Sequence, residues 1–526
     1  MSRQVYAIEV KAYDPDAAAE ITLTYAEDGF ATKSGDTPAN RHFAPRIMEA
    51  GNFSQFLVDA LVTSGRSRAG YGEIVLANLD GELDALAGYG FDGRELVVRY
   101  GRIGDAYPAA WDTVMTGTIS QIEATLAEVR LLIRDRQAEV RDLPYQPTKY
   151  AGSNSLPNGV EGVEDDLQGK PKPRLRGQVN NISPPAVNTS KFTYQVSDKV
   201  ISSLDAVYVG GLAVPSGSGH ASLAALQAAA VTAGTYDWYL GGGGDGAFFR
   251  LGTAPDNVVT CDATEGASAS NRTAAQIAKQ ILLDVGIDAG DIDSASVTAL
   301  DTANNAVIGV WTGSEEQSAG SLLDAVLGSV GGYWNIDATG NFYFGRLEDP
   351  ASGTAVQTIK SYQLISSSGQ AVERLRGRGE NDGLPAWRVV LNYRKNYTVQ
   401  RGGDVVAAVA QARRALLAEE WRNVTYDDAS VKTTHLLASE RQVYSLIVDV
   451  SDASDEAERQ QVLHGVKREF LRIQVPTSQL SALARKPGSI VELEMPRFDW
   501  SSGKKYVVTG VTDVRSARLV TLELWG

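Results

Sequence analysis

The chain has 526 residues, of which 43% are hydrophobic and 21% are charged, a balance typical of a folded protein with several domains. Acidic residues outnumber basic ones by 64 to 49, and the net charge of −15 argues against a dedicated nucleic-acid or anionic-membrane binder. Cys261 is the only cysteine, which excludes an intrachain disulfide and a cysteine-ligated cluster within one chain. The N-terminus lacks an apolar signal core and no apolar run approaches about 18 residues, so we expect a protein folded in a cytoplasm, without a membrane span.

Residues 1–145 read as an N-terminal β domain. Hydrophobic residues alternate with polar ones, and Asp80-Gly81 and Asp92-Gly93 have the composition of tight turns. The 52 glycines of the chain fit such turn-rich β structure. We predict strands at residues 5–10, 21–25, 72–79 and 95–100, and two more within residues 117–135.

Residues 146–174 are rich in proline and glycine and predict a linker. Residues 175–260 then return to strands and predict a second β domain, with a short helix over residues 221–230. Within it, Gly241, Gly243 and Gly246 match G-x-G-x-x-G, the spacing of a dinucleotide-binding loop. Such a loop must open a helix, whereas the residues that follow are short, aromatic and strand-like, so we predict a β-hairpin instead.

Residues 261–350 predict an α+β domain. Apolar residues recur with helical spacing in residues 273–285 and again in residues 317–330, and glycine ends each run. Residues 333–336 and 341–344 predict a hairpin. Neither helix carries a titratable group on its apolar stripe, so both are interpreted as structural.

Residues 351–526 predict a mixed C-terminal domain that completes a barrel. A strand is expected at residues 387–393 and helices at residues 405–421 and 456–471, the second helix with Val462, Val466 and Phe470 on one face. Three final strands are predicted at residues 489–494, 505–511 and 518–525. The fold class is therefore β-rich α+β and multidomain, with a helix-containing middle domain.

The sequence contains no arrangement of residues that indicates catalysis, a cofactor or a metal. The four histidines are scattered, and the serine motif around Ser67 is one residue too long for a nucleophile elbow. Residues 288–293 lack the glycine and terminal glutamate of a calcium loop. Paired carboxylates are common in an acidic chain and are interpreted as solvated charges. The residues considered are His42, His220, His435, His464, Asp165, Asp166, Asp291, Asp293, Glu315, Glu316, Glu419 and Glu420.

Several longer motifs, in their order along the chain, resemble those of bacteriophage tail-tip proteins of long-tailed, siphophage-type phages. They are Ala50-Gly51-Asn52-Phe53, Tyr71-Gly72-Glu73-Ile74, residues 78–84, Asp92-Gly93-Arg94, Gly169-Lys170-Pro171-Lys172-Pro173-Arg174, residues 177–182, residues 344–350 and the C-terminal residues 496–526. Together these segments span most of the chain, and none of them is catalytic.

The resemblance implies a structural virion protein of the tail tip, a baseplate hub built from small β-barrel domains. Such a hub is expected to be a homo-oligomer, typically a trimer, that joins the tail tube or distal-tail ring to tip or fibre proteins. It would surround the channel through which DNA leaves, without binding that DNA specifically, and acidic residues facing the channel would repel phosphates. The resemblance transfers no functional residue, and the single Cys261 cannot form the cysteine-ligated cluster of some tail-tip proteins.

Two alternatives to a structural hub remain. One is a tail-associated carbohydrate-binding module that recognises a receptor, for which Trp238 and Tyr239 are the candidate aromatic residues. The other is a tail-associated enzyme that degrades the cell wall, which needs two carboxylates of unequal pKa in one pocket.

Overall fold

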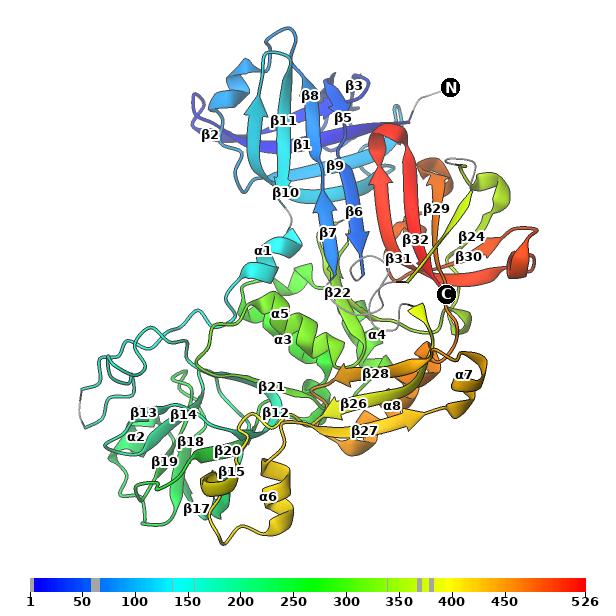
Figure 1. Cartoon of the computed structure of the whole chain (residues 1–526). Coiled ribbons are helices and arrows are strands. Elements are labelled where there is room, and N and C mark those ends of the chain that lie inside the picture. The colour runs from blue at the N-terminus through cyan, green and yellow to red at the C-terminus, as the bar shows by residue number, and fades with distance from the viewer. Residues whose placement is uncertain are drawn as a thin grey trace.

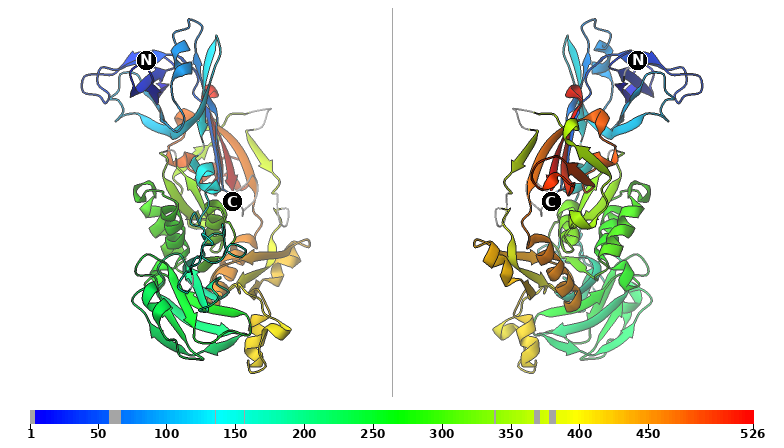
Figure 2. Two further views of the ribbon diagram at one scale, coloured as in Figure 1. Left: turned by 90° about the vertical axis from the view of Figure 1, so that its left-hand side faces the viewer. Right: turned by 90° about the vertical axis from the view of Figure 1, so that its right-hand side faces the viewer.

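The computed structural model describes residues 4–57, 67–134, 136–155, 157–337, 339–366, 371–377 and 383–526. The molecule is elongated, with N-terminal and C-terminal sheets at one end, a helical layer in the centre and two further sheets at the other end (Figure 1). Figure 2 shows the same succession of layers from both sides. Strands predominate and form several separate sheets, which confirms the predicted β-rich, multidomain α+β fold class.

A nine-stranded sheet forms the N-terminal end, in the order β3-β4-β2-β1-β9-β10-β11-β8-β5. Only Arg46 separates β4 from β5 in the sequence, although they lie near opposite ends of this order, so the sheet curls toward closure. Tyr6, Ile8 and Val10 alternate along one strand and fill the interior. The elements are β1 (Gln4–Asp14), β2 (Ala19–Ala26), β3 (Phe30–Ala31), β4 (His42–Pro45), β5 (Ile47–Glu49), β8 (Glu73–Ala77), β9 (Glu95–Arg102), β10 (Asp112–Ala124) and β11 (Glu128–Arg134).

The C-terminal sheet includes two strands from the N-terminal part of the chain. Its main path is β24-β30-β31-β32-β29-β25, and β6 pairs with β31 while β7 pairs with β6. The fully buried Arg515 donates a hydrogen bond of 2.9 Å to the carbonyl of Ala50 across the same junction. The two ends of the chain therefore form one body. The strands are β6 (Asn52–Phe56), β7 (Arg68–Tyr71), β24 (Gln357–Lys360), β25 (Val372–Leu375), β29 (Phe470–Pro476), β30 (Ile490–Glu494), β31 (Lys504–Val514) and β32 (Leu519–Trp525).

Two five-stranded sheets, β16-β15-β20-β12-β21 and β13-β14-β19-β18-β17, share one apolar core at the opposite end of the molecule. The antiparallel β18 and β19 confirm the predicted glycine hairpin, and Gly241, Gly244 and Gly246 adopt positive φ in its turn. The elements are β12 (Arg174–Ile182), β13 (Ala186–Asn188), β14 (Thr193–Ser197), β15 (Ser203–Val209), β16 (Leu212–Val214), β17 (Ser216–Gly219), α2 (Leu223–Ala228), β18 (Tyr236–Tyr239), β19 (Ala247–Leu251), β20 (Val259–Thr264) and β21 (Gly309–Thr312).

Parts of the segment predicted as a linker, residues 146–174, pack along these sheets. Tyr150 and Leu167 are buried against Leu226 and Phe248. The segment predicted as a linker thus contributes two anchoring side chains to the core of the neighbouring sheets.

The central layer confirms both predicted amphipathic helices, as α3 (Ala274–Asp284) and α5 (Ala319–Gly328). The side chains of Thr273 and Ser318 cap their N-termini. The predicted hairpin is also confirmed, as β22 (Gly332–Ile336) and β23 (Phe342–Arg346). Sequence reasoning missed α1 (Arg136–Asp142) and α4 (Ser294–Ala303).

The remaining C-terminal elements form a three-stranded sheet, β27-β26-β28, with α8 packed on it. The helix predicted at residues 456–471 is misplaced, because α8 begins at Val450 and ends at His464, and Phe470 begins β29. Val462 and Val466 are exposed, so the predicted apolar face is wrong. The helix predicted at residues 405–421 is shorter in the structure, where α6 spans only Gln411–Leu417. The elements are β26 (Ala386–Tyr393), α6 (Gln411–Leu417), β27 (Arg422–Asp427), α7 (Ala429–Thr434), β28 (Ser439–Tyr444) and α8 (Val450–His464).

Candidate functional site

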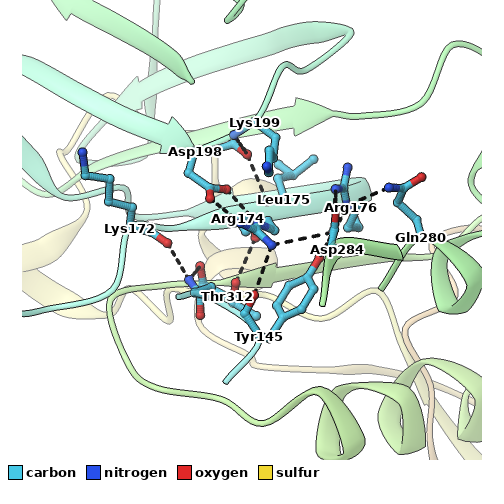
Figure 3. Close-up of polar contacts among 12 residues, drawn as sticks. Tyr145, Lys172, Arg174, Leu175, Arg176, Asp198, Lys199, Gln280, Asp284 and Thr312 are labelled. Atoms are coloured by element: carbon cyan, nitrogen blue, oxygen red, sulfur yellow. Dashed lines mark hydrogen bonds and ion pairs between the residues drawn. The ribbon is translucent and has the colours of Figure 1, made fainter. Parts of the chain in front are cut away.

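A buried network of arginine and aspartate side chains lies where β12, α3, β21 and the segment after α1 meet (Figure 3). Arg174 and Arg176 stand two residues apart on β12, and their exposed fractions are only 3% and 6%. A guanidinium ion so far from water needs charged and hydrogen-bonded partners, because an unpaired buried charge is strongly unfavourable.

Arg174 joins the first residues of β12 to the turn after β14. Its Nε donates a hydrogen bond of 2.8 Å to Asp198 Oδ1, and its Nη1 donates one of 3.1 Å to the carbonyl of Tyr145. The guanidinium also lies 4.9 Å from the centroid of the Tyr145 ring. One side chain therefore fixes both the strand and the chain that enters the middle of the molecule.

Arg176 makes a forked pair with Asp284, the last residue of α3. Its Nε donates to Asp284 Oδ2 at 3.1 Å and its Nη2 to Asp284 Oδ1 at 2.8 Å, while the Tyr145 hydroxyl donates to Oδ2 at 2.9 Å. A carboxylate at a helix C-terminus is disfavoured by the helix dipole. The arginine offsets that cost and ties α3 to β12 with fixed geometry.

Gln146 closes the network through backbone groups. Its Nε2 donates to the carbonyls of Lys172, Thr312 and Gly313 at 2.7, 3.2 and 2.9 Å. The amide thus bridges the segment that precedes β12 and the end of β21.

The surroundings shift the pKa of Tyr145 and the pKa of Arg176. Burial raises the pKa of Tyr145, which keeps its hydroxyl a donor to Asp284. Burial alone would lower the pKa of Arg176, but contact with Tyr145 and Asp284 raises that pKa overall. The network holds β12, α3 and the segment before β12 together.

The network belongs to a wider electrostatic pattern centred on residues 261–350. This segment holds 13 acidic and three basic residues, hence a net charge of −10, although the following 176 residues carry a basic excess. Cations from the flanking parts of the chain pair with these acids. The pairs include Arg136–Asp291, Arg141–Asp324, Lys149–Glu316, Arg174–Asp284, Arg176–Asp284, Arg176–Glu265, Arg459–Glu348, Arg468–Asp349 and Lys486–Asp293.

The four histidines occupy separate elements. His42 is exposed on β4, and His435 follows α7. His220 Nε2 lies 2.8 Å from Asp237 Oδ2, and burial with three nearby arginines lowers the pKa of His464. Across the described ranges, no three His, Cys, Asp or Glu side chains gather in a way that would hold a metal ion.

The other candidate residues lie at separate places in the fold. Ser67 is buried and its Oγ accepts a hydrogen bond of 2.7 Å from Gln137, while the preceding Gly65 and Arg66 lie outside the described residues. Asp293 caps α4, and Asp291 and Glu316 pair with cations as above. Exposed carboxylates are Asp165, Asp166, Glu315, Glu419 and Glu420.

The two aromatic residues considered for carbohydrate binding do not form an exposed platform. Tyr239 is buried, and its hydroxyl accepts a hydrogen bond from the backbone of Gly243. Trp238 is half-buried, with its ring 5.8 Å from that of Tyr236. Both belong to the packing of β18.

Cys261 lies fully buried in the core of the two five-stranded sheets. Burial, assisted by Asp262, raises the pKa of its thiol well above the ordinary value, so the reactive thiolate is scarce. We expect a disulfide reagent at pH 8 to modify no thiol in the folded protein and one thiol per chain after denaturation. Rapid stoichiometric labelling of the folded protein would contradict this burial.

No protein-family model matches the chain, and no curated protein matches it. Among solved structures, it is similar to a chain of the virion of a native gene transfer agent particle, with 16% identity, a TM-score of 0.45, and coverage of 68% of this chain and 85% of that chain. It is also similar to a tail protein from Neisseria meningitidis MC58, with 10% identity, a TM-score of 0.40, and coverage of 99% and 96%. The 43 kDa tail protein of prophage MuSo2 from Shewanella oneidensis has 10% identity, a TM-score of 0.37, and coverage of 100% and 96%.

Within the described part of the chain, no helix has the length and hydrophobicity of a membrane span.

Proposed function

We propose that the chain is a non-enzymatic structural protein of a phage-type tail, located in the virion at the tail tip and synthesised in the bacterial host cytoplasm. In this role it is a baseplate hub that joins the tail tube or distal-tail ring to tip or fibre proteins and surrounds the DNA exit channel. The order of tail-tip motifs along the sequence supports this proposal. The five predicted segments, 1–145, 146–174, 175–260, 261–350 and 351–526, are proposed as its units.

The structural observation that carries the proposal is the junction of the N-terminal and C-terminal sheets. β6 adds to β31 through five residue pairs, and Arg515 is buried between the two sheets. A protein that positions its partners in an assembly benefits from such a rigid body. A rigid body loses little conformational entropy when partners bind, so binding costs less free energy.

The hub proposal predicts a closed homo-oligomer. We expect light scattering across a range of concentrations to give a stable species of about three times the mass of one chain, as a cyclic trimer requires. A monomer at every concentration would contradict the trimer. Immunogold labelling of intact particles tests the location separately, and label on heads or along tails without label at the tip would contradict a tail-tip role.

The proposal also includes passage of DNA without specific binding. Since the chain carries a net charge of −15, we expect duplex DNA to show no retardation by the oligomer at physiological salt. Tight, sequence-dependent retardation would argue for a different role.

A further inference from the structure

The connection between β26 and β27 is an arm, residues 394–421, that reaches away from its own sheet. The residues that flank the arm, Tyr393 and Arg422, are paired with each other across β26 and β27. Its helix α6 lies beside β15, at the far end of the molecule from the C-terminal sheet (Figure 1). Detachment of the arm would therefore leave the β26–β27 ladder intact.

The base of the arm, residues 394–400, is held by side-chain hydrogen bonds and is called the neck. Asn181 Nδ2 donates to Asn396 Oδ1 at 2.7 Å and to the carbonyl of Thr398 at 2.6 Å. Asn396 in turn donates to the carbonyl of Leu417 at 3.0 Å. The neck thus connects β12 to the C-terminal part of the chain.

The far part of the arm, residues 402–417, is called the foot. It makes a small contact with the turn between β15 and β16, in one of the two five-stranded sheets. Val406 N donates to the carbonyl of Gly210 at 3.0 Å, and Arg413 Nε donates to that of Gly211 at 2.9 Å. The Arg413 guanidinium lies 3.8 Å from the centroid of the Tyr208 ring. Leu417 is the only buried residue of α6 and packs where Gly211 leaves room for it, since a Cβ at that glycine would lie 2.8 Å from Leu417 Cδ1.

Two features make this contact weak compared with the rest of the fold. The buried apolar side chains of the foot are few, namely Val405, Val409 and Leu417. Gln400, 1% exposed at the boundary of neck and foot, has no hydrogen-bond partner for either side-chain atom among the described residues. A buried amide without partners opposes closure of the foot, because opening restores its contact with water.

The connection between neck and foot favours movement. Gly402 and Gly403 begin the foot, and no atom lies within 4 Å of where their Cβ atoms would be. A seven-residue helix such as α6 has little stability of its own and depends on its docking site.

From these observations we propose that the foot is a releasable strap. It detaches from the Gly210–Gly211 turn as a unit, while the neck stays anchored by the hydrogen bonds that Asn181 donates to Asn396 and Thr398. Release uncovers Tyr208 and the turn between β15 and β16. This inference concerns the chain itself and does not depend on the proposed tail function.

Hydrogen exchange of the full chain, followed by mass spectrometry, tests the strap. We expect amides of residues 402–418 to exchange at least about 100-fold faster than those of α3, since local opening needs less free energy than global unfolding. Leu417→Ala should raise exchange further in the foot and in residues 208–214, with α3 unchanged. Leu416→Ala is the matched control, because its side chain is 46% exposed on the same helix.

Two results would overturn the strap. One is protection of the foot in the unmodified protein as strong as that of α3. The other is a Leu417→Ala variant in which the foot, residues 208–214 and α3 all gain exchange together. The first result requires no variant, so the test stands even if Leu417→Ala misfolds.

Discussion

Replacing Arg176 with leucine is expected to lower the free energy of unfolding by about 3–5 kcal/mol, because Asp284 then stays buried without its forked guanidinium partner. The Tyr145 hydroxyl and Arg174, at 3.8 Å, are weaker partners for this carboxylate. Both side chains are 7% exposed, so water cannot replace the lost guanidinium. The double variant Arg176→Leu with Asp284→Leu should recover part of this loss, since the buried carboxylate is removed together with the guanidinium. Full recovery is not expected, because Glu265 loses its cation and the buried Tyr145 hydroxyl loses its acceptor. Urea and thermal unfolding, monitored by circular dichroism, measure both effects.

A matched exposed pair serves as the control for the arginine experiment. Arg130 binds Glu73 and Glu128 on the N-terminal sheet with its side chain 38% exposed. Arg130→Leu should change stability by less than about 1 kcal/mol, as is usual for surface ion pairs. Equal losses for Arg130→Leu and Arg176→Leu would refute the special role of burial in the network.

Replacing Gly309 with alanine is expected to destabilise the protein by about 3 kcal/mol or more, because the added methyl group overlaps backbone atoms. Gly309 is the ladder partner of Gly177 between β21 and β12, and a Cβ there would lie 1.8 Å from the carbonyl oxygen of Gln178. The strands must separate to admit it, next to Arg176. Thermal unfolding and hydrogen exchange of β12 and β21 report the damage.

Gly290 provides the control for the glycine experiment. A Cβ at this exposed position would meet no atom within 4 Å, so Gly290→Ala should alter stability by no more than about 0.5 kcal/mol. If Gly309→Ala were equally mild, the close approach of β12 and β21 would not be a constraint on the fold.

The sequence predicted best where local pattern and end signals agree. α3 and α5 have an apolar residue every three or four positions, a Thr or Ser cap before them and glycine shortly after. The glycine hairpin could also be predicted, because the residues on both sides of the glycines have strand composition and no helix follows them. In each case the information lies within about 20 residues, the range over which propensity and periodicity act.

Prediction failed where tertiary contacts override local preference. α4 was missed because only Val297 and Leu300 are buried on a helix rich in Ser, Thr and Asp. Residues 405–421 have strong helical propensity, yet docking of Val405 and Val409 at the Gly210–Gly211 turn restricts the helix to α6. α8 was displaced because its buried face includes Glu456 and Gln460, which an apolar pattern does not mark.

The buried network left one readable signal in the sequence. Arg174 and Arg176 flank the buried Leu175 in a strand, and two arginines there require anionic partners. The partners themselves were out of reach, since Asp284 lies 108 residues beyond Arg176 and pairing over that distance depends on the whole fold.

The junction between β6 and β31 also determines when the protein can finish folding. The carbonyl that Arg515 binds belongs to Ala50, 465 residues earlier, so the ribosome releases nearly the whole chain before this contact can form. Until then β6 can pair with β7 on one side only, and its other edge stays open. Open strand edges promote aggregation of nascent chains. Synthesis that stops before β31 would leave a product prone to self-association, and the last strands thereby act as a check on complete translation.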